Sequence, residues 1–361
     1  MRIAISAAET SSDLIGSKLV LSLKAQNPGV HIEGLSGDKM TSAGCKKLWD
    51  MNLVNVMGFS EVLKKLPYLL GLRKKIIDYF SNNKPDVFIG VDAPDFNFVI
   101  EKKLKSRGIK TIHFVSPSVW AWRQNRVKKI KKSTDLILCL FPFEVDFYKS
   151  NNQRALFVGH PLAESLKPRK NHINGKNILL MPGSRESEVK KLLPEMLLAI
   201  GIMSKQDPEL KFHLALASDE LQSWAKEKIN TSAVSVSIGD AHTRMLDADL
   251  VLVASGTAAL ELALVGVPMV VIYKLSSLSY FIASRLIKSK YISLPNVIAN
   301  KDLVPELIQD NANANNIAKQ AMKIITSDTS SLVQEFNDIH SKLSLNASDE
   351  SARLIYEFIN E

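Results

Sequence analysis

The chain is predicted to be an α/β protein built from two doubly wound parallel sheets. Short apolar runs alternate with amphipathic, helix-length segments, which is typical of strands and helices in β-α-β units. This alternation occurs twice, and the polar stretch 167–176 separates the two series. The 361 residues are enough for two domains of ordinary size.

The first series begins at the N-terminus. Strands are expected where apolar and β-branched residues run together, and helices where apolar residues recur every three or four positions. The strands are expected at residues 2–7, 31–35, 86–91, 110–115 and 135–140, and the helices at 14–25 and 97–106. A parallel sheet with helices on both faces accounts for this order.

The second series follows a predicted linker at 167–176, which contains Pro168 and Gly175. Its strands are expected at 177–181, 211–217, 233–238, 250–254 and 269–273, its helices at 189–203 and 220–228, and the chain from residue 315 onward is mostly helical. We assign residues 1–166 to an N-terminal domain and 177–340 to a C-terminal domain. Residues 341–361 are expected to form a helical tail that packs on the N-terminal domain or on a partner subunit.

Composition restricts the classes of partner. The formal net charge of +9 favours an anionic partner, but no nucleic-acid-binding module is recognisable. No apolar run is long enough to span a bilayer, and the N-terminus enters a strand without a signal-peptide pattern. Cys45 and Cys139 lie in apolar surroundings without metal-ligand spacing, as expected of reduced cysteines in a cytoplasmic protein.

A glycine turn follows the first strand of the second series. Pro182-Gly183-Ser184-Arg185 joins that strand to a helical pattern. The first N–H groups of such a helix lack internal partners and attract phosphate. Ser184 is expected to cap the helix, and Arg185 offers a planar pair of donors for a diphosphate. Taken alone, the motif suits an ordinary exposed turn equally well.

A second turn of the same kind, Ser255-Gly256-Thr257, follows the strand at 250–254. Glu261 lies one turn after Thr257 on the same helix face, where its carboxylate is placed to accept hydrogen bonds from ribose hydroxyls. The alternative is a surface glutamate favoured by the helix macrodipole. Two such turns indicate a nucleoside diphosphate at the carboxyl ends of the strands.

Three further segments accompany the two turn motifs: Asp92-Ala93-Pro94-Asp95-Phe96-Asn97, Ser116-Pro117-Ser118-Val119-Trp120-Ala121-Trp122-Arg123 and Ser293-Leu294-Pro295-Asn296. The set closely resembles that of the lipid-A-disaccharide synthase family, which are bacterial glycosyltransferases. The resemblance extends from the first strand to about Leu307. The segment that ends in Trp-Ala-Trp-Arg is its most specific part.

The resemblance implies a GT-B fold, in which two Rossmann-like domains face a cleft. It implies that a 2,3-diacylglucosamine passes from UDP to 2,3-diacylglucosamine 1-phosphate with inversion, giving lipid A disaccharide 1-phosphate and UDP. Neither a metal nor another cofactor is expected, and nucleic acid is not an expected partner. Lipid substrates imply a cytoplasmic protein that is peripheral on the inner-membrane surface. Whether it forms a homodimer is left open.

Two carboxylates follow the strand at 86–91. Asp92, at its carboxyl end, is placed to take a proton from an acceptor hydroxyl, and it matches the family's essential aspartate. We therefore interpret Asp92 as the catalytic base. Asp95 is the better candidate for a helix cap. Two carboxylates around a proline are weak evidence for a metal.

Other expected substrate contacts rest on the resemblance. In the loop after the first strand, Glu9, Ser11 and Asp13 match the family, whereas Ala8 and Ser12 replace family glycines and leave the backbone less freedom. The alternative is a polar loop in which Asp13 caps the next helix.

Trp122 and Arg123 are further candidates and would line an acceptor pocket, although spacing alone favours a core role for the tryptophans. Asn296 matches a nucleotide-binding position. The basic run at 123–132 is expected to form a solvated helix face that also attracts an acidic lipid head group.

Residues 57–75 combine apolar side chains with a basic end. The segment is too short and too charged to span a bilayer. It suits a helix in the membrane interface, with Leu66, Leu69 and Leu72 on its apolar side. Amphipathic helices packed on the sheet are the alternative.

Two other functions stay open. One is another UDP-sugar enzyme of the same fold, either a soluble-acceptor transferase or an epimerase, which would have no reason for membrane affinity. The other is a non-catalytic basic protein that binds a membrane surface or nucleic acid, which would not bind UDP.

Overall fold

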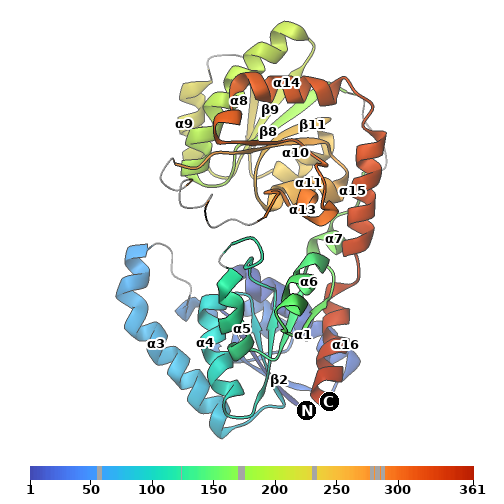
Figure 1. The fold of residues 1–361 in the computed structure, drawn as a ribbon. Helices are drawn as coiled ribbons and strands as arrows, with labels where there is room; N and C mark the ends of the chain where they lie inside the picture. Colours follow the sequence, from blue (N-terminus) through green and yellow to red (C-terminus); the bar gives the residue numbers. More distant parts are fainter. Residues whose placement is uncertain are drawn as a thin grey trace. The chain divides into compact units, whose positions relative to one another are not determined.

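The computed structural model describes residues 1–54, 59–122, 124–169, 175–229, 234–276 and 289–361, together with Tyr280 and Arg285; for residues 59–65 and Lys226 it describes only the backbone. The chain forms two compact units. The first consists of Met1–Glu164 and Leu343–Glu361, and the second is Ser165–Lys342. Each unit contains a parallel sheet flanked by helices (Figure 1). The predicted α/β class with two doubly wound sheets is confirmed.

The sheet of the first unit has the strand order β3-β2-β1-β4-β5-β6-β7. Its strands are β1 (Arg2–Ala7), β2 (His31–Ser36), β3 (Lys46–Asp50), β4 (Val87–Val91), β5 (Lys110–Phe114), β6 (Leu136–Cys139) and β7 (Ala155–Phe157). Its helices are α1 (Thr10–Gln26), α2 (Asp38–Ser42), α3 (Phe59–Asn82), α4 (Pro94–Lys105), α5 (Val127–Ser133), α6 (Pro142–Ser150), α7 (Pro161–Ser165) and α16 (Ala347–Asn360). The order reverses direction at β1, so the loops after β1 and β4 leave the sheet beside each other.

Alternation along the strands divides the core of this unit between the two sheet faces. Ile3 and Ile5 pack in a cluster with residues of α1 and α16, whereas Ala4 packs in a cluster with residues of α3 and α4. Successive side chains of a strand point to opposite faces. The sheet is therefore covered on both faces, which explains why its central strands are apolar throughout.

The second unit has the strand order β10-β9-β8-β11-β12-β13. Its strands are β8 (Asn177–Met181), β9 (Lys211–Leu216), β10 (Val234–Ile238), β11 (Leu250–Ala254), β12 (Met269–Tyr273) and β13 (Glu306–Ile308). Its helices are α8 (Glu186–Gln206), α9 (Asp219–Lys228), α10 (Ala241–Asp247), α11 (Thr257–Val265), α13 (Leu294–Ala299), α14 (Ala314–Ile325) and α15 (Ser330–Leu343). Leu180 and Leu252 share a core cluster with residues of α8 and α14. α10 and α11 contact the same sheet and lie on its other side (Figure 1).

The predicted strands agree with the structure except at three edges. β3, β7 and β13 were not predicted, and each forms an edge of its sheet. An edge strand pairs on one side only, and β7 and β13 have three residues each. Such short segments carry too little apolar pattern to be recognised.

The C-terminal residues return to the first unit. Ile355 and Phe358 of α16 belong to the core cluster of β1, and the Tyr356 hydroxyl donates to the carbonyl of Leu23 in α1 at 2.7 Å. The described part of the predicted linker, residues 167–169 and 175–176, lies in the second unit. There Arg169 donates to the carbonyl of Ala248 at 2.6 Å.

Within the described residues, every helix is too short or too polar to cross a membrane.

Candidate active site

The first predicted phosphate turn connects β8 to α8. Gly183 has a φ of +112°, and a Cβ there would lie 2.5 Å from Oε2 of Glu188, so any other residue would be strained. The helix N-cap is Arg185, and no side chain caps it. The predicted Ser184 cap is therefore wrong, because α8 begins one residue later than a Ser184 cap requires. The Ser184 side chain is exposed.

Arg185 lies in solvent at the start of α8. Its Nη1 is 3.1 Å from Oε1 of Glu188, and its side chain is 79% exposed. An exposed ion pair contributes little to stability, so the guanidinium is available to an anionic ligand. Tyr273 ends β12 nearby: burial raises the pKa of its phenol, the charge of Glu188 raises it further and Arg185 lowers it. Sequence spacing did not identify Tyr273 as a neighbour of this turn.

The second predicted turn stands beside the first. β11 pairs with β8 in parallel, with Val253 opposite Met181, so both strands end at the same edge of the sheet. Gly256 is the N-cap of α11, and Gly256 and Thr257 are exposed. The Ser255 hydroxyl lies 3.3 Å from the carbonyl of Ile292. Two helix starts therefore present unpaired N–H groups side by side, an arrangement suited to two linked phosphates.

Glu261 is half-buried on α11, one turn after Thr257. Burial raises the pKa of its carboxyl, and His242 partly opposes this shift. No described residue donates a hydrogen bond to the Glu261 carboxylate. Its oxygens are therefore available as acceptors for the hydroxyl groups of a ligand.

Asn296, which was predicted to contact the nucleotide, has its side-chain amide bonded within the protein. Its side chain is buried, and Nδ2 donates to the carbonyl of Val304 and to Oε1 of Glu306, both at 2.9 Å. Oδ1 accepts from the N–H groups of Leu303 at 2.9 Å and Val304 at 2.8 Å. All four hydrogen-bonding positions of the amide are thus filled internally. Asn296 holds the 303–306 segment, and its partners could not be inferred from the local motif.

In the first unit, the predicted base and the β1 loop lie at one sheet edge. β1 and β4 pair in parallel, with Ala7 opposite Val91. Asp92 directly follows β4 and is half-buried. Desolvation raises the pKa of Glu9, and the negative charge of Asp92 raises it further. Ser11 is exposed in the first turn of α1.

Asp13 is buried beneath this loop, not directed toward it. Its carboxylate accepts from the N–H groups of Gly37 at 2.8 Å, Lys39 at 3.0 Å and Met40 at 3.2 Å. These groups form the start of α2, so Asp13 caps a helix that is distant in sequence. The alternative expectation, that Asp13 caps its own helix, is wrong, because α1 already begins at Thr10 and Asp13 lies inside it.

Asp95 is not the cap of α4. The N-cap is Ala93, in the left-handed conformation, and Asp95 lies in the first helical turn with an 87% exposed side chain. Its carboxylate pairs with Arg126 at 2.6 Å. The sequence favoured Asp95 because capping residues are usually polar, but here the backbone conformation of Ala93 determines where the helix begins.

The tryptophan segment has one half-buried ring and one exposed ring. Trp120 packs edge-on against Phe143, with ring centroids 4.6 Å apart. Trp122 is 41% exposed. Arg123 lies outside the described residues.

The apolar side of α3 is only partly exposed. Leu69 and Leu72 are buried, and Leu72 belongs to the core cluster that includes Phe88. Their assignment to a membrane-facing side is therefore wrong. Leu72 packs with residues of the sheet, as the alternative expected, and Leu69 is buried. Leu66, Tyr68 and Leu70 are exposed, at 42%, 48% and 52%. The side chains of Lys64 and Lys65, and all of residues 55–58, lie outside the described residues.

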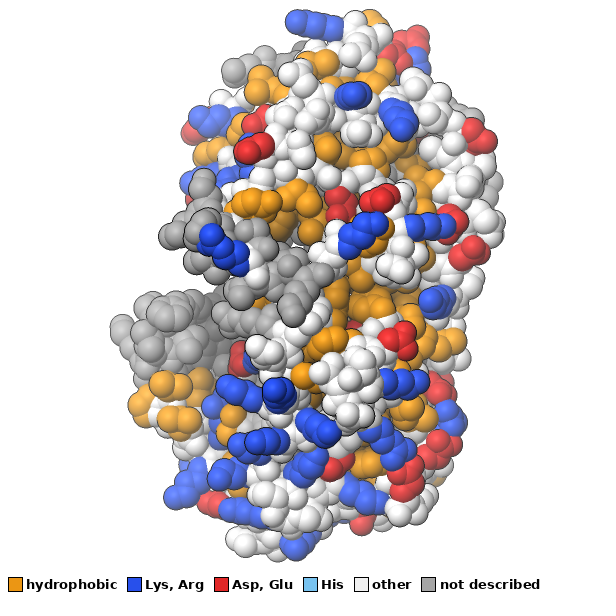
Figure 2. Space-filling view, in the orientation of Figure 1, with side chains coloured by type: hydrophobic (Ala, Val, Ile, Leu, Met, Phe, Trp, Pro, Cys, Tyr) orange, Lys and Arg blue, Asp and Glu red, His pale blue; other side chains and the backbone are white. Residues whose placement is uncertain are grey.

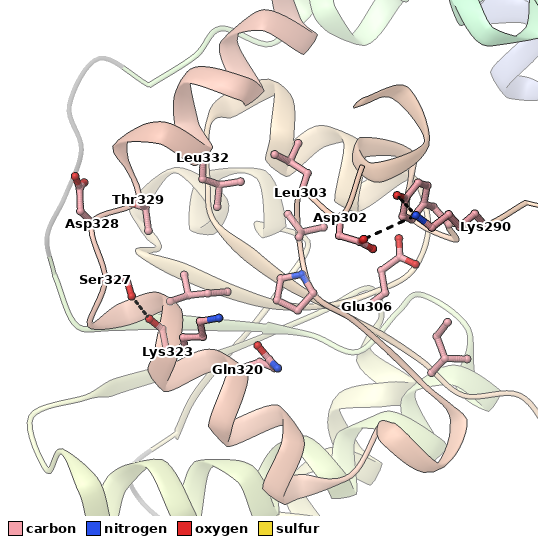
Figure 3. A pocket seen from close by; sticks show the side chains of 15 residues that line it. Lys290, Asp302, Leu303, Glu306, Gln320, Lys323, Ser327, Asp328, Thr329 and Leu332 are labelled. Atoms are coloured by element: carbon pink, nitrogen blue, oxygen red, sulfur yellow. Dashed lines mark hydrogen bonds and ion pairs between the residues drawn. The ribbon is translucent and has the colours of Figure 1, made fainter. Parts of the chain in front are cut away.

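A cavity of about 560 Å³ lies elsewhere in the second unit, between the β13 segment and the C-terminal end of α14 (Figure 3). Lys290 and Asp302 line it, with Nζ of Lys290 4.0 Å from Oδ2 of Asp302. Gln320 and Lys323 of α14 line it as well. None of the predicted nucleotide contacts lines it. The cavity therefore does not mark the paired glycine turns.

Comparison with known proteins gives matches over nearly the whole chain. The family model for lipid-A-disaccharide synthetase matches residues 3–356. The lipid-A-disaccharide synthase of Hahella chejuensis is 42% identical over 100% of this chain and 95% of the relative. The enzyme of the same name from Haemophilus influenzae (strain 86-028NP) is 40% identical over 99% and 97%.

The chain belongs to the lipid-A-disaccharide synthase family.

As a member of the lipid-A-disaccharide synthase family, the chain is a glycosyltransferase. Solved structures agree at the level of the fold. The UDP-GlcNAc 2-epimerase from Neisseria meningitidis, bound to UDP-GlcNAc, has a TM-score of 0.63 at 12% identity, covering 99% of each chain. The glycosyltransferase of kitacinnamycin has a TM-score of 0.61 at 14% identity, covering 99% of this chain and 98% of that one. Among the residues that the structure describes, no group of three or more His, Cys, Asp or Glu side chains could hold a metal ion.

The buried glutamate Glu144 is expected to make the stability of the protein depend on pH. Burial raises the pKa of Glu144 from its ordinary value of 4.5 to about 8, although the N–H of Phe141 and the Ser116 hydroxyl favour its ionised form. The folded state therefore prefers the protonated acid. This contribution to stability is fully present below pH 4.5 and is lost as the pH rises through about 8.

We expect the free energy of unfolding to fall by up to about 1.4 kcal/mol per pH unit across this window because of Glu144. Glu144→Gln should flatten that part of the profile, since glutamine keeps an acceptor for Phe141 and does not ionise. Urea denaturation of both proteins at several pH values measures the difference. Parallel profiles would show that Glu144 does not ionise in this range.

Proposed function

We propose that the chain joins two acylated glucosamines. A 2,3-diacylglucosamine moves from UDP to 2,3-diacylglucosamine 1-phosphate, forming lipid A disaccharide 1-phosphate and releasing UDP. Family membership supports the reaction. The structural observation that carries the proposal is the parallel pairing of β8 with β11. This pairing places the two glycine turns, each followed by a helix, at the same edge of the sheet.

In this proposal the second unit binds the donor. N–H groups at the starts of α8 and α11, together with Arg185, take the diphosphate, and Glu261 accepts from the ribose hydroxyls. These donors also stabilise the negative charge that develops on UDP as its bond to the sugar breaks. Positive charge and oriented N–H groups at the diphosphate serve this purpose without a metal.

The first unit supplies the base. The acceptor hydroxyl attacks the anomeric carbon, Asp92 takes the hydroxyl proton, and the bond from the anomeric carbon to UDP breaks. A single displacement of this kind inverts the anomeric centre. Glu9 and Ser11, on the neighbouring loop, would orient the acceptor, and Trp122 would contact its apolar part.

Mass spectrometry of purified protein with the two lipid substrates tests this function. The expected products are the disaccharide 1-phosphate and an equal amount of UDP. Formation of an epimerised UDP-sugar without a disaccharide would instead support the related epimerase activity. Failure to bind UDP in calorimetry would contradict both enzymes.

Arg185→Ala is expected to weaken UDP binding without unfolding the protein. Loss of a charged hydrogen bond costs about 1.5–3 kcal/mol, or roughly 10- to 150-fold in Kd. Lys190→Ala is a matched control, because Lys190 is a basic residue on the same helix and pairs with exposed Glu186. Calorimetry with UDP measures both variants. If Arg185→Ala bound UDP as tightly as the original protein, Arg185 would not be part of the UDP site.

We further propose that the first unit docks on a membrane surface. Leu66, Tyr68 and Leu70 are exposed on α3, and the part of the surface where α3 lies shows hydrophobic side chains close to a field of Lys and Arg over α4 and α5 (Figure 2). The exposed basic residues of α4 and α5 are Lys102, Lys103, Lys128, Lys129, Lys131 and Lys132. Apolar side chains would reach the acyl boundary, and each basic group near anionic lipid contributes about 1 kcal/mol.

Replacing Leu66, Tyr68 and Leu70 together with serine should reduce binding to anionic liposomes and lipid turnover, and should leave UDP affinity and the melting temperature near their original values. Salt should release the original protein only in part, since apolar burial persists at high ionic strength. Leu198→Ser is the control, because Leu198 is a 64% exposed leucine on α8 of the second unit. Undiminished liposome sedimentation of the triple variant would contradict this docking surface.

A further inference from the structure

The chain leaves β4 through a strained turn at the proposed base. Asp92 has a φ of +50° and Ala93 a φ of +43°, so two consecutive residues with a Cβ adopt the left-handed conformation. At the end of the adjacent strand, Val115 has a φ of +76°. Such conformations are unfavourable for most residues other than glycine; aspartate tolerates them better than alanine, and β-branched residues tolerate them least. They persist only where surrounding contacts enforce them, and they concentrate at functional sites.

Asn97, the fourth residue of α4, supplies those contacts. Its side chain is fully buried, and Nδ2 lies 2.8 Å from the carbonyl of Asp92, 3.2 Å from that of Ser6 and 3.3 Å from that of Val91. Oδ1 accepts from the Ser6 hydroxyl at 2.7 Å. One amide thus joins β1, the end of β4 and the backbone of Asp92.

The backbone around this amide permits close packing. A Cβ on Gly90 would lie 2.9 Å from the Cβ of Asn97 and 2.1 Å from Oε1 of Glu101, so glycine in β4 lets α4 approach the strand. The N–H of Asp92 donates to the carbonyl of Phe114 at 2.8 Å, which ties the turn to β5. The turn is therefore fixed from both neighbouring strands and from the helix that follows it.

The carboxylate of Asp92 has no comparable support. No described residue donates a hydrogen bond to its side-chain oxygens or forms an ion pair with them. Its direction therefore depends on the backbone of Asp92, whose N–H is held by the carbonyl of Phe114 and whose carbonyl is held by Asn97.

We propose that Asn97 is a positioning residue for sugar transfer, which holds the left-handed Asp92–Ala93 turn so that the Asp92 carboxylate is aligned with the acceptor hydroxyl. The inference rests on the proposed function, in which Asp92 is the base. It predicts that loss of the amide lowers kcat through Asp92 and leaves donor binding intact.

The test compares Asn97→Ala, Asn97→Asp and the double variant Asn97→Ala with Ala93→Gly. Asn97→Asp keeps the size and the Ser6 acceptor but loses the N–H donors. Both single variants should lower kcat by about 100-fold, the effect of a displacement of about 1 Å, with little change in UDP affinity. Glycine at position 93 adopts the left-handed conformation without strain. The kcat of the double variant should therefore be about 10-fold higher than that of Asn97→Ala. A merely structural asparagine gives no reason for this rescue.

Asp95→Asn is the matched control, because Asp95 lies on the same helical turn but is exposed. If Asn97→Ala does not fold, Ser6→Ala removes one hydrogen bond from the same amide and should still lower kcat by about 10-fold at unchanged UDP affinity. An unchanged kcat in the folded variants, with Asp92→Asn inactive, would overturn the positioning role alone. An active Asp92→Asn would overturn the base assignment and the positioning role together.

Discussion

Asp92→Asn should abolish sugar transfer and leave UDP affinity close to that of the original protein. Asparagine has nearly the same size, so the turn after β4 is retained, but an amide cannot take the proton of the acceptor hydroxyl. Loss of a general base lowers turnover by roughly 10²- to 10⁴-fold. The proposed diphosphate contacts belong to the second unit, whose residues do not include Asp92. Turnover by mass spectrometry and UDP binding by calorimetry measure the two effects.

Asp95→Asn is the control for this experiment. Its expected effect on stability is smaller than the sequence alone indicated. Since Asp95 does not cap α4 and its pair with Arg126 is exposed, the substitution should alter stability by less than about 1 kcal/mol. Its turnover should remain near that of the original protein. An inactive Asp95 variant of normal stability beside an active Asp92 variant would reverse the assignment.

The general architecture was predictable because it depends on local pattern. Buried parallel strands are continuous apolar runs and the helices between them are amphipathic, so the strand at 177–181 and the helix that follows it were both recognised. β13 was not recognised, since a three-residue edge strand has no such pattern. The two glycine turns were also predictable, because a strand, a glycine turn and a helix start are adjacent in sequence.

Details that depend on distant partners were not predictable. Asp13 caps a helix that begins 25 residues later, and Asn296 is occupied by the segment at 303–306. A sequence motif identifies the residue type at such a position but not the groups that surround it. Similarly, periodicity indicated an apolar side of α3 but not that Leu69 and Leu72 pack in the core while Leu66 remains exposed.

The predictions of which residues cap the helices failed for a related reason. Capping preferences are averages over side chains, whereas the backbone torsions of a particular turn decide which residue is the N-cap. Ala93 caps α4 because two left-handed residues precede Pro94, and Arg185 caps α8 because Gly183 turns the chain before it. In both cases the unusual torsions lie at proposed site residues, where local rules are expected to fail.

Gly183→Ala should therefore have a large effect on the donor site. The φ of +112° lies in a region that alanine rarely adopts, and the new Cβ would lie 2.9 Å from the Cβ of Glu188. Strain of this kind costs about 1–3 kcal/mol. Relief of that strain would move the start of α8, and with it the N–H groups and Arg185 that are proposed to bind the diphosphate. We expect UDP affinity to fall by at least about 10-fold and the melting temperature to decrease.

Gly201→Ala is the matched control on the same helix. A Cβ at Gly201 meets no atom within 4 Å, and the residue lies in the helical interior of α8. Alanine there should raise stability by about 0.5–1 kcal/mol and leave UDP binding unchanged. If Gly183→Ala lowered stability but kept full UDP affinity, the turn would be structural only. If instead affinity is lost at position 183 and retained at position 201, the backbone of this one turn, and not the stability of α8 as a whole, determines donor binding.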